Sequence, residues 1–241
     1  MIIEICANGY QSAMNAQKSG ADRIELCSEL AVGGLTPSYG LIKKIKDDLE
    51  IPVHVLVRPR SGNFTYSEEE FEIIKNDINI CKQLGCEGIV SAVLNDDNTI
   101  DVARTKELVE LSKPMSFTFH RAFDWVQNPI GELEQLITCN VNCILTSGQQ
   151  NEAIKGLDLL KKLKDKAKNR IEIMPGGGVN INNILTFKKA NFTQIHFSAT
   201  TLVKSKNKVK VSMNSARFFN ESVVPVSDVN RMNKMVTLAK S

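Results

Sequence analysis

The sequence alternates short β-rich runs with longer stretches of helical periodicity, and this unit recurs about eight times at intervals of roughly 20 to 35 residues. The predicted strands are Ile2–Cys6, Arg23–Cys27, Val53–Arg58, Gly88–Val93, Ser116–His120, Cys143–Ser147, Ile171–Met174 and Gln194–Ser198. Eight parallel strands joined by helices close a (β/α)8 TIM barrel, which typically needs about 250 residues. We therefore expect residues 1–241 to form a single barrel domain. After about residue 200 we expect a long loop, mobile over the site, and a C-terminal helix.

Helix boundaries support the same alternation. Helix starts are predicted at Pro37, Ser67, Asp101 and Pro129, and helix exits at Gly20, Gly85 and Ala190. No low-complexity linker interrupts the repeats.

Alternate positions along the strands form two chemically different sets. The first set is apolar: Ile3, Ile5, Ile24, Leu26, Val53, Val55, Val57, Phe117, Phe119, Ile171, Ile173, Ile195 and Phe197. The second set is polar: Glu4, Cys6, Glu25, Cys27, His54, Arg58, Thr118, His120, Glu172, His196 and Ser198. In a barrel one set faces the helices and the other faces the interior. Unpaired buried charges are costly, so we expect the interior groups to be paired, hydrated or functional.

A doubly wound open sheet is the rival architecture, because it also alternates strands and helices. Its strands would be apolar on both faces. The polar set above therefore favours the barrel.

Composition limits the partners and the cellular compartment. Formal charge is +3, and the lysines of 161–168 and 204–210 have no aromatic residues between them, so we expect solvated surface and no nucleic-acid partner. No apolar run approaches the roughly 20 residues of a membrane span, and Met1 runs into Ile2 without a signal-peptide pattern. We expect a cytoplasmic protein without a membrane partner. Its six cysteines contain no CxxC and should be reduced.

A glycine run follows the seventh predicted strand. Gly176, Gly177 and Gly178 precede a predicted helix, where free backbone N–H groups and the helix dipole favour an anion. Together with Ser198 after the eighth strand, they match the loops of the usual barrel phosphate site. The alternative is that the glycines only make a tight turn.

Basic residues end two further strands. Arg58 ends the third, and His120 and Arg121 end the fifth, so all three should lie at the barrel mouth. Arg58 could instead pair internally with Glu25, and Arg121 with Asp124. His120 could be a general acid or base, or a structural histidine.

Three inward glutamates are candidates for a general base, or could simply neutralise Arg58 and Arg121. These glutamates are Glu4, Glu25 and Glu172. His54 begins its strand, so we expect a structural role near the barrel bottom. For an enzyme, the candidate catalytic residues are Glu25, Arg58, His120, Arg121 and Glu172. The absence of inward lysines and of a G-x-S-x-G elbow argues against Schiff-base and serine-hydrolase chemistry.

Cys6 and Cys27 end neighbouring strands with the same inward parity, so their thiols could meet. Two thiolates suit Cu(I), and His196 on the eighth strand would allow a Cys₂His zinc site. The alternative is two small side chains that fill the barrel top.

Taken in order, several blocks of the sequence resemble the CutC copper-homeostasis family. The blocks are Glu4–Cys6, Gly20–Ser28, Gly33–Ser38, Val57–Arg60, Phe119–Asp124, Leu145–Gln149 and Ile173–Gly178. The resemblance implies a (β/α)8 barrel, a cytosolic homo-oligomer (dimer or tetramer), and copper handling with Cu(I) at Cys6 and Cys27; it implies no known reaction. Ala7 and Ser91 depart from the pattern, and after Thr200 little matches beyond Arg217 to Asn220.

Three hypotheses follow, from different functional classes. The first is a copper-homeostasis protein that binds Cu(I) through Cys6 and Cys27. The second is a barrel enzyme that acts on a small phosphorylated or carboxylated molecule. The third is a non-catalytic oligomeric scaffold.

Overall fold

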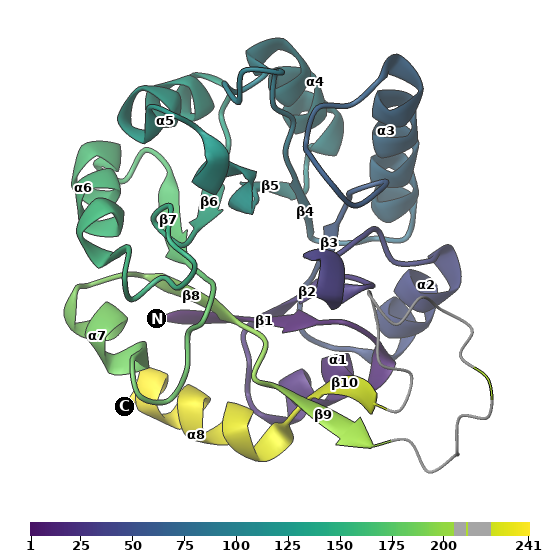
Figure 1. Ribbon diagram of the computed structural model, residues 1–241. Helices are drawn as coiled ribbons and strands as arrows, with labels where there is room; N and C mark the ends of the chain where they lie inside the picture. Colours follow the sequence, from purple (N-terminus) through teal and green to yellow (C-terminus); the bar gives the residue numbers. More distant parts are fainter. Residues whose placement is uncertain (205–210, 212–222) are drawn as a thin grey trace.

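A computed structural model describes residues 1–204, 211 and 223–241. The barrel strands are β1 (Ile2–Ala7), β2 (Arg23–Leu26), β3 (Val53–Leu56), β4 (Gly88–Ser91), β5 (Ser116–Phe119), β6 (Cys143–Thr146), β7 (Glu172–Pro175) and β8 (Gln194–Phe197). The helices around them are α1 (Tyr10–Lys18), α2 (Tyr39–Asp48), α3 (Glu68–Gln83), α4 (Val102–Ser112), α5 (Pro129–Thr138), α6 (Leu157–Ala167) and α7 (Ile184–Lys189). Figure 1 shows these helices as a ring around the strands. The predicted (β/α)8 barrel is confirmed.

All neighbouring strands pair in parallel, in the order β7-β6-β5-β4-β3-β2-β1-β8. β7 and β8 pack against each other without a regular ladder, so the barrel is nearly closed. The register sets Glu4 of β1 level with Arg23 of β2 and with His196 of β8. It also sets Cys6 level with Glu25. Charged side chains from three strands therefore share one level of the interior.

The apolar parity set forms the core between strands and helices. All of its members are buried, including Ile3, Ile24 and Ile195, each with 0% exposure. Burying one such side chain contributes roughly 1.5 to 3 kcal/mol, so this layer accounts for much of the stability. Inside the barrel, Cys143, Leu145 and Met174 make a small apolar patch on the β6–β7 side.

Helix starts follow the local chemistry of the sequence. Ser67 and Glu70 form a capping box at α3, and Asp101 caps α4 through the N–H of Arg104. One start differs from expectation: α2 is capped by Ser38, and Pro37 precedes the helix instead of lying in its first turn. The reason is that the Ser38 side chain accepts the N–H of Leu41.

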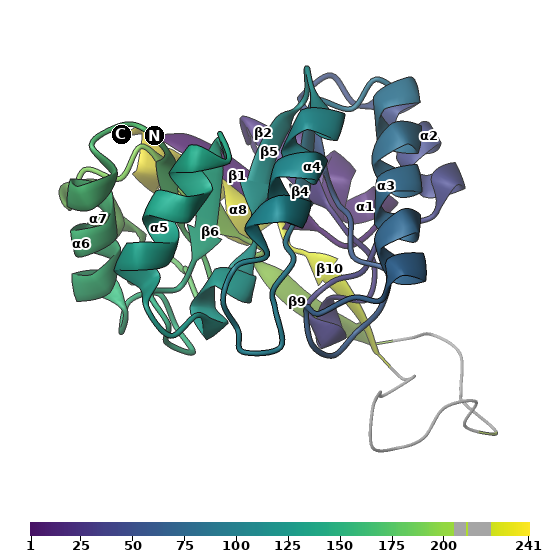
Figure 2. The same cartoon turned by 90° about the horizontal axis from the view of Figure 1, so that it is seen from above.

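Short elements gather at the carboxyl end of the barrel. They are η1 (Leu30–Val32), η2 (Arg121–Trp125) and the hairpin of β9 (Thr200–Lys204) with β10 (Val223–Ser227), after which α8 (Val229–Lys240) ends the chain. Figure 2 shows these short elements at one end and both termini at the other. The loop expected after residue 200 lies largely outside the described residues, as do Arg217 to Asn220. No helix in the described part of the chain is long and apolar enough to cross a membrane.

Candidate functional site

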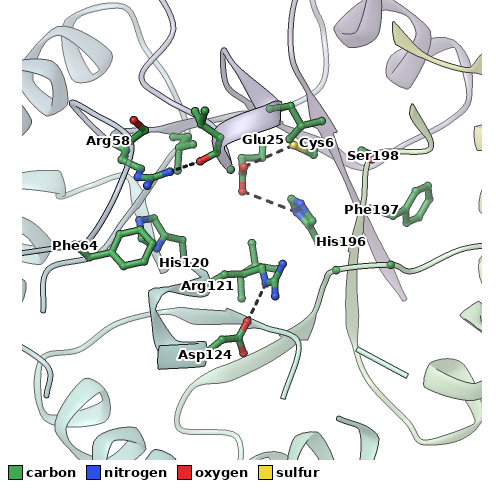
Figure 3. A pocket seen from close by; sticks show the side chains of 18 of the residues that line it. Cys6, Glu25, Arg58, Phe64, His120, Arg121, Asp124, His196, Phe197 and Ser198 are labelled. Carbon is green, nitrogen blue, oxygen red and sulfur yellow. Dashed lines mark hydrogen bonds and ion pairs between the residues drawn. The ribbon is translucent and has the colours of Figure 1, made fainter. Parts of the chain in front are cut away.

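A cavity of about 710 Å³ opens at the carboxyl ends of the strands. This volume lies within the usual range for small-molecule sites, roughly 300 to 1,000 Å³. Its wall takes residues from β1, β2, β3, β6 and β8 and from the segments that follow β2, β3, β5, β7 and β8. Figure 3 shows Cys6, Glu25 and His196 close together, with Arg58 and His120 to their left and Arg121 below them.

Glu4 is the electrostatic centre beneath this cavity. Its fully buried carboxylate lies 2.5 Å from Nε of Arg23, 2.8 Å from Nδ1 of His196 and 3.6 Å from Nδ1 of His54. Burial alone would raise the pKa of Glu4, but the hydrogen bond from His196 and the charge of Arg23 outweigh it and hold the pKa well below its usual range. Glu4 is therefore ionised and compensated.

Glu25 is the carboxylate that faces the cavity without such compensation. Burial raises the pKa of Glu25 to about 7, against the attraction of His196. Its Oε2 atom has no hydrogen-bond partner among the described residues and lies 3.9 Å from Nδ1 of His196. Burial lowers the pKa of His196, but Glu25 and Glu4 outweigh burial and raise it. Glu25 and His196 thus form a pair that can hold or release a proton near neutral pH.

The two inward cysteines meet beside this pair. Sγ of Cys6 lies 3.7 Å from Sγ of Cys27 and 3.9 Å from Oε1 of Glu25. The adjacent Cys27 thiol and burial together raise the pKa of Cys6 well above its ordinary value. Candidate ligand atoms of Cys6, Glu25 and His196 lie within 4.8 Å of one another. This arrangement offers sulfur, nitrogen and oxygen to one ion.

Arg58 does not pair with Glu25, contrary to the alternative considered from the sequence. Its Nη1 donates to the carbonyls of Val32 and Gly34 at 2.8 and 3.1 Å, and its Nη2 donates to the carbonyl of Gly62 at 2.8 Å. The guanidinium also packs 4.9 Å from the centre of the Phe64 ring. Arg58 therefore joins the loops after β2 and β3 at the cavity wall.

His120 is buried, with 6% exposure, and lines the cavity. Its Nδ1 accepts the N–H of Ala122 at 3.1 Å, which leaves the proton of the neutral ring on Nε2. Burial and the nearby Arg58 charge lower the pKa of His120 to about 3. At neutral pH His120 is thus a hydrogen-bond donor, and Nε2 has no partner among the described residues.

Arg121 pairs with Asp124 at 2.8 Å, as one alternative anticipated. Its Nη2 also donates to Oγ of Ser147 at 2.9 Å. Asp124 is held in turn by the N–H groups of Ser147 and Gln149. These contacts fix the guanidinium at the mouth.

The glycine run passes beneath Arg121. A Cβ at Gly177 would lie 3.2 Å from Nη1 of Arg121, and both Gly177 and Gly178 have positive φ. Their N–H groups have no acceptor within the described ranges. Gly176 differs: it is buried, its N–H donates to Thr146, and it does not line the cavity.

The run does not lead directly into a helix, so that part of the anion argument is wrong. Asn180 and Asn183 make side-chain turns first, and α7 begins only at Ile184. Donors in this region are therefore individual N–H groups, without a helix dipole behind them. Ser198 lines the cavity as expected.

The comparisons with known proteins agree with one another. The profile of the CutC family matches residues 1–201. The chain belongs to the CutC family. A human relative named copper homeostasis protein cutC homolog is 39% identical over 244 residues, covering 100% of this chain and 89% of its own length. A family protein CutC from Parabacteroides distasonis is 46% identical over 207 residues, covering 85% of each chain.

A solved CutC structure matches the fold as well. The CutC protein of Streptococcus agalactiae superposes with a TM-score of 0.78 at 34% identity, covering 82% of this chain and 98% of that one. The family profile ends at residue 201 and so covers all eight barrel strands.

Glu172 lies at the wrong end of the barrel for a residue of this site. It is the first residue of β7, its Oε2 accepts from Thr193 just before β8, and it lines a separate cavity of about 260 Å³. Because the first residue of a parallel strand lies at the barrel bottom, Glu172 is separated from the other candidate catalytic residues. His54 is low in the barrel beside Glu4, as predicted.

Sequence reasoning missed three residues in or beneath this cavity. Arg23 pairs with Glu4 and keeps it ionised. The signal that could have identified it is its position on the strand next to that of Glu4, where the two residues are register partners. Phe64 and Trp125 contribute the aromatic part of the wall. Trp125 is the single tryptophan of the chain and directly follows Asp124, so its position beside the mouth could have been noticed.

Proposed function

We propose that this chain acts in copper homeostasis, like the relatives that carry that name, and that it binds one Cu(I) ion through Cys6 and Cys27. The observation that carries the proposal is the 3.7 Å separation of the two Sγ atoms. Soft thiolate ligands favour Cu(I), as they also do zinc and iron–sulfur clusters, over hard ions such as Mg²⁺ and Ca²⁺. Cys6 lines the cavity, which gives an ion a path from solvent.

The surrounding residues fit such an ion. His196 and Glu25 lie close enough to add a nitrogen or oxygen ligand. His196, whose pKa is raised by Glu25 and Glu4, provides positive charge near Cys6. Since the Cys6 thiol holds its proton at neutral pH, copper loading must release protons.

The experiment is an anaerobic Cu(I) titration against the competitor bathocuproine disulfonate. The wild type and a Cys86→Ser control, altered at a thiol outside the cavity, should each take one copper from the competitor. The Cys6→Ser, Cys27→Ser double variant should take none. Equal uptake by the double variant would refute the site.

A second candidate function is the binding or conversion of a small phosphorylated or carboxylated molecule. A cavity of about 710 Å³ is much larger than one ion requires, and this observation favours the candidate. Arg121, Gly177 and Gly178 offer donors on one wall, and Glu25 with His196 offers proton transfer on another. Crystals soaked in inorganic phosphate should show density in the cavity beside Arg121 and Gly177, and a vacant cavity would count against this candidate.

We also propose a cytoplasmic homo-oligomer. All six cysteines are free and buried, which fits a reducing compartment. Leu202, Val203 and Val224 on the β9–β10 hairpin are 64%, 48% and 53% exposed, a surface suited to a second copy. Light scattering coupled to size-exclusion chromatography should give a dimer or tetramer. A monomer at micromolar concentration would contradict this.

A further inference from the structure

One wall of the cavity carries a tryptophan that the protein leaves uncovered. Trp125 is 48% exposed at the end of η2 and lines the cavity. Its ring meets Phe64 in an edge-on contact, with 4.7 Å between centroids. Exposed apolar area costs about 25 cal/mol per Å², so a ligand that covers Trp125 gains binding energy.

Phe64 holds the tryptophan in place. Its ring centre lies 5.0 Å from that of His120 and 4.9 Å from the Arg58 guanidinium, and both of those residues are buried. Arg58 is itself bonded to three backbone carbonyls. The aromatic wall is therefore pre-organised, which lowers the entropic cost of binding.

Hydrogen-bond donors without acceptors lie on a second wall. Nε and Nη2 of Arg121 are engaged, but Nη1 has no acceptor within the part of the chain that is described. This nitrogen lies against Gly177. The backbone N–H groups of Gly177 and Gly178 likewise have no acceptor among the described residues. On the aromatic side, the buried Nε2–H of His120 adds another unpaired donor.

We infer that the cavity recognises a small oxyanion, carboxylate or phosphate ester, that carries an aromatic ring. The oxyanion lies against Arg121 and the N–H groups of Gly177 and Gly178, and the ring packs on Trp125. This inference rests on the second candidate function above and adds the chemical class of the ligand. It is independent of the copper proposal, because neither Trp125 nor Arg121 is a proposed copper ligand.

The aromatic character of the ring distinguishes this ligand class from other anions. An aromatic ring in contact with Trp125 gains stacking or edge-on energy beyond its buried area, about 0.5 to 1.5 kcal/mol. A saturated ring of similar size buries comparable area without that gain. The predicted preference for the aromatic ring is therefore roughly two- to twelvefold in Kd.

The test compares two matched pairs of probes by isothermal titration calorimetry: phenyl phosphate with cyclohexyl phosphate, and benzoate with cyclohexanecarboxylate. Because Trp125 is the only tryptophan, fluorescence reports directly on the site. The aromatic member of at least one pair should bind roughly two- to twelvefold more tightly and change the tryptophan emission. Trp125→Leu should abolish the preference, and Trp125→Phe should restore most of it.

Tyr39→Leu is the matched control, since Tyr39 is an exposed aromatic residue on α2 that does not line the cavity. It should keep the wild-type preference. Equal affinity within each pair, or a preference that survives in Trp125→Leu, would overturn the aromatic assignment and leave the oxyanion pocket standing. If none of the four probes binds, the oxyanion pocket fails too.

Discussion

Nδ1 of His196 lies 2.8 Å from Oε1 of Glu4, so a buried ion pair links the eighth strand to the first. Arg23 approaches the same carboxylate from the second strand. Three consecutive strands of the barrel wall are thereby joined through one fully buried charge. The polar interior is part of the framework as well as of the site.

Glu4→Gln should lower the free energy of unfolding by about 3 kcal/mol, because it leaves Arg23 and His196 without their compensating charge. Urea denaturation measures this loss. Glu50→Gln, at an exposed residue, should change stability by less than about 0.5 kcal/mol. Similar small effects for both variants would show that Glu4 is dispensable to the framework.

His120 should make stability depend on pH. Its pKa is about 3 in the folded protein against 6.5 for the free side chain, so on acidification the unfolded chain takes up the proton first. The contribution of neutral His120 to the free energy of unfolding is therefore complete above about pH 6.5 and is lost as the pH falls towards about 3. By pH 5 the loss is about 2 kcal/mol.

His120→Asn isolates this effect, because asparagine can still accept the N–H of Ala122 but does not titrate. The charged groups around His120 are Arg58, Arg121 and, across the cavity, Glu25, and all three remain in the variant. From pH 7 to pH 5 the free energy of unfolding of the wild type should therefore fall by about 2 kcal/mol more than that of the variant. A difference that does not vary with pH would contradict the buried, neutral histidine.

Gly34→Ala should cost about 2 kcal/mol or more. Gly34 has φ +91°, and a Cβ there would lie 2.5 Å from Cδ2 of Leu56 and 3.4 Å from Cβ of Cys27. Gly40→Ala in α2 meets no atom within 4 Å and should be neutral or stabilising by up to about 1 kcal/mol. Thermal melts of the pair check this, and equal melting temperatures would argue against the close packing at Cys27.

Arg58→Lys should loosen the cavity wall, since one ammonium cannot replace a guanidinium bonded to Val32, Gly34 and Gly62. Hydrogen exchange should increase in segments 30–36 and 61–65, with a loss of roughly 2 kcal/mol in stability. Arg170→Lys, at an exposed ion pair with Glu134, should cost less than about 1 kcal/mol. Unchanged hydrogen exchange in both segments would show that Arg58 does not hold these two loops together.

The alternation of side chains along the strands predicted most of the fold and much of the site. It separated Ile3 and Ile5, which pack against the helices, from Glu4 and Cys6, which face the interior. This was possible because a strand imposes a period of two whatever the tertiary context. Proximity of Cys6 to Cys27 followed from the same rule.

Other features were not predicted, either because residue types carry no signal for them or because the available signal was overlooked. Arg58 binds backbone carbonyls of two loops, and every residue has such a carbonyl, so its partners had no sequence signal. Asn180 and Asn183 delay the start of α7 through side-chain turns, which their residue type would have allowed us to predict. Parity alone indicated that Glu172 faces inward. Its place as the first residue of its strand also had to be considered, because that place puts it at the bottom of the barrel.

The central claim is that one Cu(I) ion binds between Cys6 and Cys27. Copper K-edge X-ray absorption of the protein loaded with one Cu(I) tests it most directly. The account predicts two sulfur neighbours in the wild type and none in the Cys6→Ser, Cys27→Ser double variant. Copper bound only by nitrogen and oxygen, or the same sulfur signal in the double variant, would contradict it.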